Sequence, residues 1–337
     1  MIEEYFLLSE KVLSKLFRLP PKAPSYFLLK GDASERNFVR IKYYEKSQIK
    51  NSILMIYPNR EDNSLKDYLD IQRLLKNHKL PVPEVFAFSI EDAVALLEDL
   101  GDQTLLQALS RHPEEIDSLY VEAIEILARM QSSLNVGKEE SIAFKRKFDT
   151  EKYLYELNFF RKNYIENLLG KKIQKEHSHI FDQGFYKMSK MLAEYEPLVF
   201  THRDYHSRNL MVKKGKIVMI DFQDARLGPP QYDLVSLLKD SYVSLEEAFV
   251  EKMINHYFIM RENCNFPVKD KVNFMRFFYI CALQRNLKAI GTFAFQKVSR
   301  GREDYLQYIK PTFEYVKKNP LIKGDFAILW EVLSKYL

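Results

Sequence analysis

The chain has 337 residues, a length that suits two compact units better than one simple core. Its composition is 46% hydrophobic and 29% charged, which excludes an intrinsically disordered chain, and a formal net charge of +5 is too small to indicate a nucleic-acid-binding protein. Aromatic residues are abundant, with 21 Tyr and 24 Phe, whereas Gly occurs only 10 times. This balance predicts a helix-rich protein with an aromatic core.

The two cysteines, Cys264 and Cys281, form neither a CxxC pair nor a metal-binding spacing, which fits a reducing compartment. The opening MIEEYFLLSEKVLSKLF lacks the basic start of a signal peptide and is interpreted as an amphipathic helix. No stretch reaches the roughly 18 uninterrupted apolar residues of a membrane span. We therefore expect a cytoplasmic protein with no membrane or nucleic-acid partner, and a monomer by default.

The first hundred residues are rich in strand-like runs. Each run is short and apolar and is bounded by Gly, Pro or a polar turn. The expected strands lie within residues 26–44 (on either side of a polar turn at 31–34), 51–58, 84–89 and 93–100. Between them, residues 64–80 show helical spacing, with Ser64 as the expected N-cap.

After Gly101 helical spacing predominates, over residues 117–134, 153–170 and from 232 to the end. Short strand-like runs return only between 197 and 222. This order predicts an α+β fold of two lobes, a strand-rich N-lobe at 1–97 and a helix-rich C-lobe at 102–337. Residues 98–101 would connect them, and a cleft between two lobes suits a ligand site.

The most informative stretch is LVFTHRDYHSRNLMV at residues 198–212. It has the spacing His-Arg-Asp-x-x-x-x-Asn, which ends at Asn209, and twelve positions later Asp221 ends another apolar run in VMIDFQD. Phosphoryl transfer from ATP requires this layout. One carboxylate, on Asp204, orients the acceptor hydroxyl and takes its proton. An amide oxygen on Asn209 and a carboxylate on Asp221 bind Mg²⁺, a hard cation that prefers oxygen ligands.

The alternative interpretation is two unrelated polar turns at strand ends. A His-Arg-Asp tripeptide alone would favour it. Here the spacing to Asn209, the flanking strands and the Asp that ends the downstream strand all agree. This agreement in the expected structural context favours a kinase.

HRDYHSRNLMV and IDFQDARLGPPQYDLVSLLKDSY resemble the aminoglycoside phosphotransferase-like kinases, which share the bilobal protein-kinase-like fold. Three further segments, LKGDASERNFVRI, LLEDLGDQTL and CALQRNLKAIGTFAF, are similar to one branch of that family. Members of this branch phosphorylate N-acetylmuramate and N-acetylglucosamine at the anomeric position during peptidoglycan recycling. The resemblance covers residues 26–310 and implies ATP and Mg²⁺ as cofactors and a sugar as substrate.

The resemblance also implies roles for individual residues. Asp204 would be the catalytic base, with Asn209 and Asp221 as metal ligands. The turn between the first two strands would bind the nucleotide phosphates through Gly31, Asp32, Ala33 and Ser34. The backbone of Glu98, Asp99 and Leu100 would bind the adenine edge. Asp233 would cap or brace the helix after the metal loop.

Two features depart from the kinase pattern. The phosphate loop has a single glycine, so an ordinary hairpin turn fits it as well. The strand at 51–58 lacks the expected phosphate-binding Lys. The candidates for a replacement cation are Lys42, Lys50 and Arg40, and those for its acidic helical partner are Asp67 and Asp70.

The acceptor is predicted to be a small molecule, because only about a dozen residues separate Asp221 from Asp233 and no long activation segment follows. The basic, aromatic segment at 276–303 favours a neutral or carboxylate-bearing sugar over a polycationic aminoglycoside. The candidate sugar contacts are Gln223, Asp224, Arg285 and Lys288. In the alternative view, Arg285 and Lys288 lie on a solvated helix face. His202 and His206 are expected to brace the loop.

The sequence therefore predicts a kinase that transfers the γ-phosphoryl group of ATP to a sugar hydroxyl, at the anomeric position. Two rival hypotheses remain. One is an aminoglycoside or choline-type kinase of the same fold, because the aromatic residues also suit a quaternary amine. The other is a nucleotide-binding pseudokinase, suggested by the missing strand Lys.

Overall fold

The computed structural model describes residues 14, 22–29, 36–45, 48–59, 63–134 and 139–337. The phosphate loop predicted at 31–34 and the helix predicted at the N-terminus lie outside these residues. Contacts within the chain divide it into two units. The first comprises Met1–Gln103 and Met211–Gln223, and the second comprises Thr104–Leu210 and Asp224–Leu337.

The boundary between the units falls at Gln103, close to the predicted connector at 98–101. Residues 211–223 group with the first unit, although the sequence analysis placed them in the C-terminal lobe. The division into lobes at 97 and 102 stays a prediction. No helix among the described residues is both long enough and apolar enough to cross a membrane.

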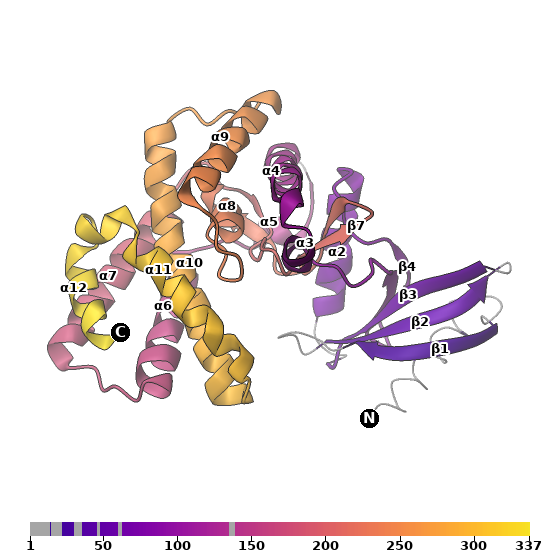
Figure 1. Ribbon diagram of the computed structural model, residues 1–337, viewed down its shortest axis with the longest axis horizontal. Coiled ribbons are helices and arrows are strands. Elements are labelled where there is room, and N and C mark those ends of the chain that lie inside the picture. Colours follow the sequence, from indigo (N-terminus) through magenta and orange to yellow (C-terminus); the bar gives the residue numbers. More distant parts are fainter. Residues whose placement is uncertain (1–13, 15–21, 30–35, 46–47, 60–62, 135–138) are drawn as a thin grey trace. The chain divides into compact units, whose positions relative to one another are not determined.

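The first unit contains a five-stranded antiparallel sheet in the order β1-β2-β3-β5-β4 (Figure 1). Its strands are β1 (Lys22–Leu29), β2 (Asn37–Glu45), β3 (Gln48–Ile56), β4 (Val85–Ser89) and β5 (Val94–Glu98). Alternate residues such as Val39, Ile41, Leu54 and Ile56 are buried in one cluster, as the period of two requires. The strands predicted for this region are therefore confirmed, and they form one antiparallel sheet.

Helix α2 (Ser64–Asn77) belongs to the same unit and buries Leu65, Tyr68 and Ile71. The prediction that Ser64 is its N-cap is wrong by one residue. The backbone carbonyl of Asn63 accepts the first helical hydrogen bond, from the Asp67 amide at 2.9 Å, so Asn63 is the cap.

A short hairpin completes the first unit. Its strands are β7 (Leu210–Lys213) and β8 (Lys216–Met219), joined by Lys214 and Gly215, which both have positive φ as a tight hairpin turn requires. The Val212 amide donates to the Gln103 carbonyl at 2.7 Å, and the Met219 amide donates to the Pro81 carbonyl at 2.8 Å. These bonds hold the segment that leads to Asp221 against the rest of the unit.

The second unit is mostly helical. Its elements before the catalytic loop are α3 (Leu105–Arg111), α4 (Ile116–Ser133), α5 (Ile142–Lys145), α6 (Thr150–Phe160), α7 (Lys175–Ala193) and β6 (Val199–Thr201). After the metal loop come β9 (Arg226–Gly228), α8 (Gln231–Leu238), α9 (Glu247–Asn263), α10 (Lys271–Arg300), α11 (Ile309–Lys317) and α12 (Ala327–Leu333). Short 3₁₀ turns cover Pro113–Glu115, Glu303–Tyr308, Pro320–Lys323 and Ser334–Tyr336.

Strand β9 and helices α3, α5 and α7 lie outside the predicted ranges. Strand β9 pairs with β6, but its three residues are too few to show a strand period. The helix predicted at 153–170 is an α-helix only to Phe160 and continues as a π-helix over Arg161–Leu168. The other helical predictions for this unit are confirmed.

Helix α10 is the central helix of the second unit, and α6, α7, α8 and α11 all pack against it (Figure 1). Its N-cap Asp270 accepts a hydrogen bond from the Asn273 amide at 2.9 Å, and Gly301 ends it with a φ of 68°.

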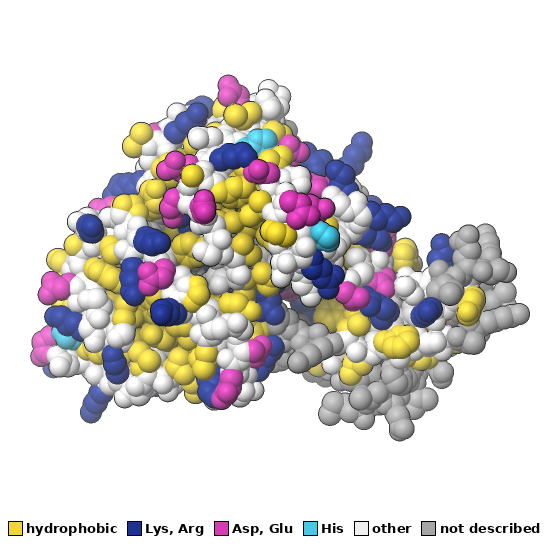
Figure 2. Space-filling model, in the orientation of Figure 1, with side chains coloured by type: hydrophobic (Ala, Val, Ile, Leu, Met, Phe, Trp, Pro, Cys, Tyr) yellow, Lys and Arg dark blue, Asp and Glu magenta, His cyan; other side chains and the backbone are white. Residues whose placement is uncertain are grey.

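On the face of the molecule in Figure 2, basic and acidic side chains are interspersed, as expected for a solvated surface.

Close packing between α10 and α6 gives a direct test of the fold. A Cβ atom at Gly291 would lie 2.6 Å from the Phe160 Cα atom, so Gly291→Ala forces the two helices apart. Ala favours an exposed helix by about 1 kcal/mol over Gly. We nevertheless expect a loss of about 1–3 kcal/mol in the free energy of unfolding, measured in urea, because overpacking outweighs helix propensity. Unchanged or increased stability would contradict this packing.

Candidate active site

The catalytic loop lies in the second unit and begins directly after β6. Its first two amides, those of His202 and Arg203, donate to the carboxylate of Asp233 at 2.6 and 3.0 Å. Asp233 is fully buried in the first turn of α8, whose N-cap is Pro230. The alternative that Asp233 caps this helix is therefore wrong, because its carboxylate is turned toward the catalytic loop.

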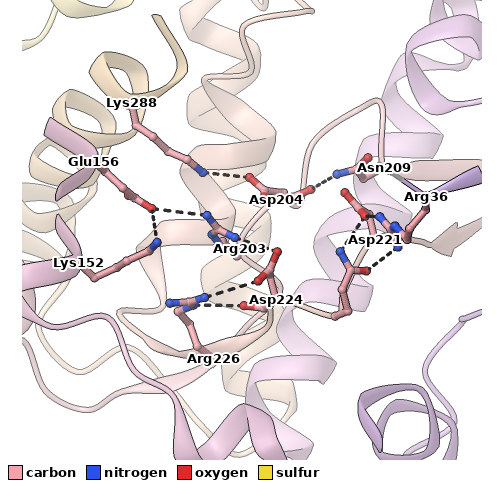
Figure 3. A network of polar contacts seen from close by, with 11 residues as sticks. Arg36, Lys152, Glu156, Arg203, Asp204, Asn209, Asp221, Asp224, Arg226 and Lys288 are labelled. Carbon is pink, nitrogen blue, oxygen red and sulfur yellow. Dashed lines mark hydrogen bonds and ion pairs between the residues drawn. The ribbon is translucent and has the colours of Figure 1, made fainter. Parts of the chain in front are cut away.

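Asp204 follows these two residues. Its Oδ1 accepts a hydrogen bond from Lys288 Nζ at 3.2 Å, and its backbone carbonyl accepts one from Asn209 Nδ2 at 3.0 Å (Figure 3). Lys288 comes from α10, so the central helix of the unit contributes directly to the environment of Asp204. The Asp204 side chain remains 27% exposed.

The charges around Asp204 fix its protonation state. Burial opposes ionisation, but nearby positive charges hold the pKa of its carboxyl well below the usual value. In decreasing order of effect, these charges come from Lys288, Arg203, His206 and Arg285. Asp204 is therefore a carboxylate at neutral pH and only a weak base, which suits a group that orients a hydroxyl rather than one that strips its proton early.

Arg203 has a φ of 81°, which is rare for a residue with a side chain. Its guanidinium lies 3.0 Å from the Asp224 carboxylate and 3.7 Å from that of Glu156 (Figure 3). The buried Glu156 also accepts a hydrogen bond from Gln284 Nε2 at 2.9 Å. These partners hold the strained turn before Asp204 in place.

The metal loop lies in the first unit. Arg36 precedes β2 and forms an ion pair with Asp221, and its Nη1 donates to Gln223 Oε1 at 3.0 Å (Figure 3). Phe222 stacks on Tyr68 of α2 with ring centroids 4.9 Å apart. Asp221 itself has a φ of 67° and a side chain that is 34% exposed. These contacts fix the loop on both sides of Asp221, and solvent can still reach the Asp221 carboxylate.

Sequence analysis missed Arg36. It lies 185 residues from Asp221 along the chain, and no local pattern links the two. The only available signal was its position directly after the predicted phosphate loop. The proposed replacements for the strand Lys are placed differently: Lys42 and Lys50 are exposed, and Arg40 Nε lies 2.7 Å from the Asp99 carboxylate.

The predicted adenine-binding segment follows β5. Glu98 Oε1 accepts a hydrogen bond from Lys213 Nζ at 2.6 Å, and the Asp99 carbonyl accepts another from the same amine at 2.9 Å. Burial opposes ionisation of Glu98, but Lys213 lowers the pKa of its carboxyl below the usual value. Leu100 is buried. These contacts give the segment a fixed conformation, and its role in binding adenine stays a prediction.

The remaining candidates are His202, His206 and Arg285 of the second unit and Asp70 of the first. His202 is fully buried beside Tyr205, and the His206 ring packs edge-on against Tyr242. Arg285 is only 5% exposed, so the alternative that it lies on a solvated helix face is wrong. Asp70, one candidate for the acidic helical partner, pairs with Arg73 of its own helix at 3.2 Å.

The two predicted metal ligands have suitable chemistry for Mg²⁺. Asn209 uses its amide nitrogen on the Asp204 carbonyl, which leaves its oxygen as the ligand atom that a hard cation would meet. Asp221 offers a carboxylate. Each of these side chains, taken by itself, thus offers the kind of oxygen atom that Mg²⁺ prefers.

Comparison with known proteins agrees with this chemistry. Residues 28–266 match the phosphotransferase enzyme family. The chain is 29% identical over 306 residues to the N-acetylmuramate/N-acetylglucosamine kinase of Neisseria meningitidis serogroup B, covering 90% of this chain and 88% of the relative. It is 30% identical over 305 residues to the enzyme of the same name from Pseudomonas aeruginosa, covering 90% and 86%.

Among solved structures, the choline kinase from Cryptosporidium parvum matches with a TM-score of 0.66 and 13% identity, covering 96% of this chain and 98% of that one. This likeness supports the α+β, protein-kinase-like fold that the sequence predicted. The chain belongs to the phosphotransferase enzyme family. The predicted resemblance to this family is confirmed.

The bonds to Asp233 give a test of how the catalytic loop is held. Asp233→Asn replaces one acceptor oxygen by an NH₂ group that faces a backbone amide. We expect a loss of about 1.5–3 kcal/mol in the free energy of unfolding, since hydrogen bonds to a charged acceptor are broken in a buried site. We also expect lower turnover of ATP. Asp182→Asn, a change of an exposed carboxylate in the same unit, serves as control. A variant as stable and active as the wild type would contradict the bracing role.

Proposed function

We propose that the protein is an ATP- and Mg²⁺-dependent kinase that phosphorylates the anomeric hydroxyl of N-acetylmuramate or N-acetylglucosamine. The observation that carries the proposal is the ionised Asp204, held by Lys288 and next to the braced turn at Arg203, in a chain similar to kinases named for these sugars. Such a kinase would act in the cytoplasm, because ATP is the phosphoryl donor. Its two sugar substrates would give it a role in cell-wall recycling.

Asp204 orients the acceptor in this proposal. Its carboxylate accepts the hydrogen bond of the acceptor hydroxyl and points a lone pair of that oxygen at the γ-phosphorus. The bond from the γ-phosphorus to the ADP oxygen breaks as the new oxygen–phosphorus bond forms. The electron pair stays on ADP, and the hydroxyl proton passes to Asp204 and then to solvent. Because the transition state is loose, a weak base is sufficient.

Asn209 and Asp221 would hold Mg²⁺, which supplies positive charge to the phosphate oxygens when bound. The phosphate loop at 31–34 and the backbone of Glu98, Asp99 and Leu100 would bind the nucleotide. Gln223, Asp224, Arg285 and Lys288 would surround the acceptor, and His202, His206 and Asp233 would act as braces.

Asp204→Asn tests the catalytic assignment. The amide keeps the shape of the carboxylate but loses its charge, so we expect turnover to fall by about 10²–10⁴-fold. The dissociation constant for Mg²⁺–ADP should stay within twofold of the wild-type value. Asp182→Asn, an exposed carboxylate of the same unit, is the matched control. Comparable turnover in Asp204→Asn and wild type would contradict the assignment.

We also propose that Arg36 is the phosphate-binding cation that replaces the missing strand Lys. Its side chain is 12% exposed, its ion pair is to the predicted metal ligand Asp221, and it follows the predicted phosphate loop directly. A guanidinium suits bidentate contacts with phosphate oxygens. Arg40, by contrast, forms ion pairs with the carboxylates of Asp99 and Asp102.

Arg36→Met should weaken Mg²⁺–ADP binding by about tenfold to a hundredfold, as expected for a lost charged hydrogen bond. Binding of adenosine, which has no phosphate, should change less than twofold. Calorimetry measures both, and Lys42→Met removes an exposed charge of β2 as control. Equal weakening of ADP and adenosine, or no change in either, would overturn the role of Arg36.

A further inference from the structure

Arg285 on α10 is unusual for a buried cation. It is 5% exposed, its Nε atom has no hydrogen-bond partner, and within the described part of the chain its guanidinium forms no ion pair. Asp204 and Asp233 interact with it only through their longer-range fields. A buried charge without a direct partner lowers the stability of a protein.

Two other arginines of this unit, one buried and one partly buried, do have partners. Arg261 is 3% exposed and donates to the Phe266 carbonyl, the Gln131 side chain and the Tyr257 hydroxyl. Arg203 pairs with Asp224 and Glu156. Arg285 is therefore an exception within its own unit, and a ligand that brings an anion would remove the penalty.

Lys288 marks where such an anion would lie. It is three residues after Arg285 on the same helix, a spacing that places both side chains on one face. Its Nζ atom lies 3.2 Å from Asp204 Oδ1, and its side chain is 16% exposed. Lys288 thus contacts the carboxylate that would hold the acceptor hydroxyl, and Arg285 lies on the same face of α10.

We propose that Arg285 and Lys288 form a binding site for the oxygens of the transferred phosphoryl group, in the transition state and in the phosphorylated product. The proposal rests on the proposed function of Asp204. The phosphorus becomes bonded to the same oxygen that Asp204 orients, so its own oxygens come within a few ångströms of Lys288. A planar guanidinium provides two parallel donors to such a group.

The carboxylate of N-acetylmuramate is the other anion that could lie here. It is carried on the third ring carbon, two carbons away from the anomeric centre, whereas Lys288 contacts the group that binds the anomeric oxygen itself. The geometry therefore favours the phosphoryl group. The two sources are separable, because N-acetylglucosamine has no carboxylate.

Binding of inorganic phosphate tests the site without turnover. With Mg²⁺–ADP at saturation to fill the nucleotide phosphate positions, we expect wild type to bind phosphate in calorimetry, and Arg285→Met and Lys288→Met to bind it about tenfold more weakly or worse. Arg276→Met and Lys297→Met, changes of exposed ion-paired residues on the same helix, should bind like wild type. Absence of binding in wild type, or equal binding in Arg285→Met, would overturn the proposal.

Turnover separates the two anions. If the site holds the phosphoryl group, Arg285→Met lowers kcat by a similar factor for N-acetylglucosamine and for N-acetylmuramate. A rise in KM confined to N-acetylmuramate would assign the site to the carboxylate and overturn the proposal. Phosphate binding that depends on Arg285 in a protein that phosphorylates neither sugar would keep the anion site and refute the proposed function instead.

Stability gives a further criterion. Because the Arg285 charge has no direct partner among the residues that the structure describes, Arg285→Met should unfold at the same temperature as wild type or at a higher one. This also ensures that a folded variant is available for the binding assay. A clearly lower unfolding temperature would indicate a structural role for the guanidinium and contradict the proposed site.

Discussion

The catalytic loop depends on two buried carboxylates that accept hydrogen bonds from its backbone. Asp233 binds the amides of His202 and Arg203, and Asp240 binds the amide of Ser207 at 2.9 Å. A loop has few backbone partners of its own, so such bonds decide its shape. Since α8 packs on the central helix α10, the helical core of the unit determines the position of Asp204.

This arrangement has an electrostatic cost. Burial raises the pKa of Asp233 to about 7, although the two loop amides favour its charged form. Asp204 shows the opposite balance, because the cations around it keep it ionised. The two carboxylates therefore differ: Asp233 holds the backbone of the loop, and Asp204, in the proposed function, presents a charge to the acceptor. Catalysis by such a site relies on orientation and on positive charge at the phosphoryl group rather than on strong base chemistry.

The fold and the candidate site were predictable from the sequence where the pattern lies within one short stretch of the chain. The spacing from Asp204 to Asn209 and the strand that ends at Asp221 are contiguous patterns, and the strands of the first unit follow from alternating apolar residues. The partners of these residues were not predictable. Lys288 is 84 residues from Asp204, and Arg36 is 185 residues from Asp221, so only tertiary packing brings each pair together. The π-helix after Phe160 likewise has no distinct period in a short sequence window.

The acceptor interpretation changed most between sequence and structure. Arg285 and Lys288 were candidate sugar contacts only because they lie in a basic segment, and a solvated helix face was an open alternative. Burial of Arg285 and the contact of Lys288 with Asp204 remove that alternative. A basic segment in a sequence thus shows only that cations are present. Burial and pairing distinguish the cations that are candidates for a function from those on a solvated surface.

The most direct test of the central claim is the site of phosphorylation. The protein would be incubated with ATP, Mg²⁺ and N-acetylglucosamine, and the product would be examined by ³¹P and ¹H NMR. The account predicts a phosphate on the anomeric oxygen, seen as coupling between phosphorus and the anomeric proton. Phosphorylation at another hydroxyl, or no product with this sugar or with N-acetylmuramate, would contradict the account.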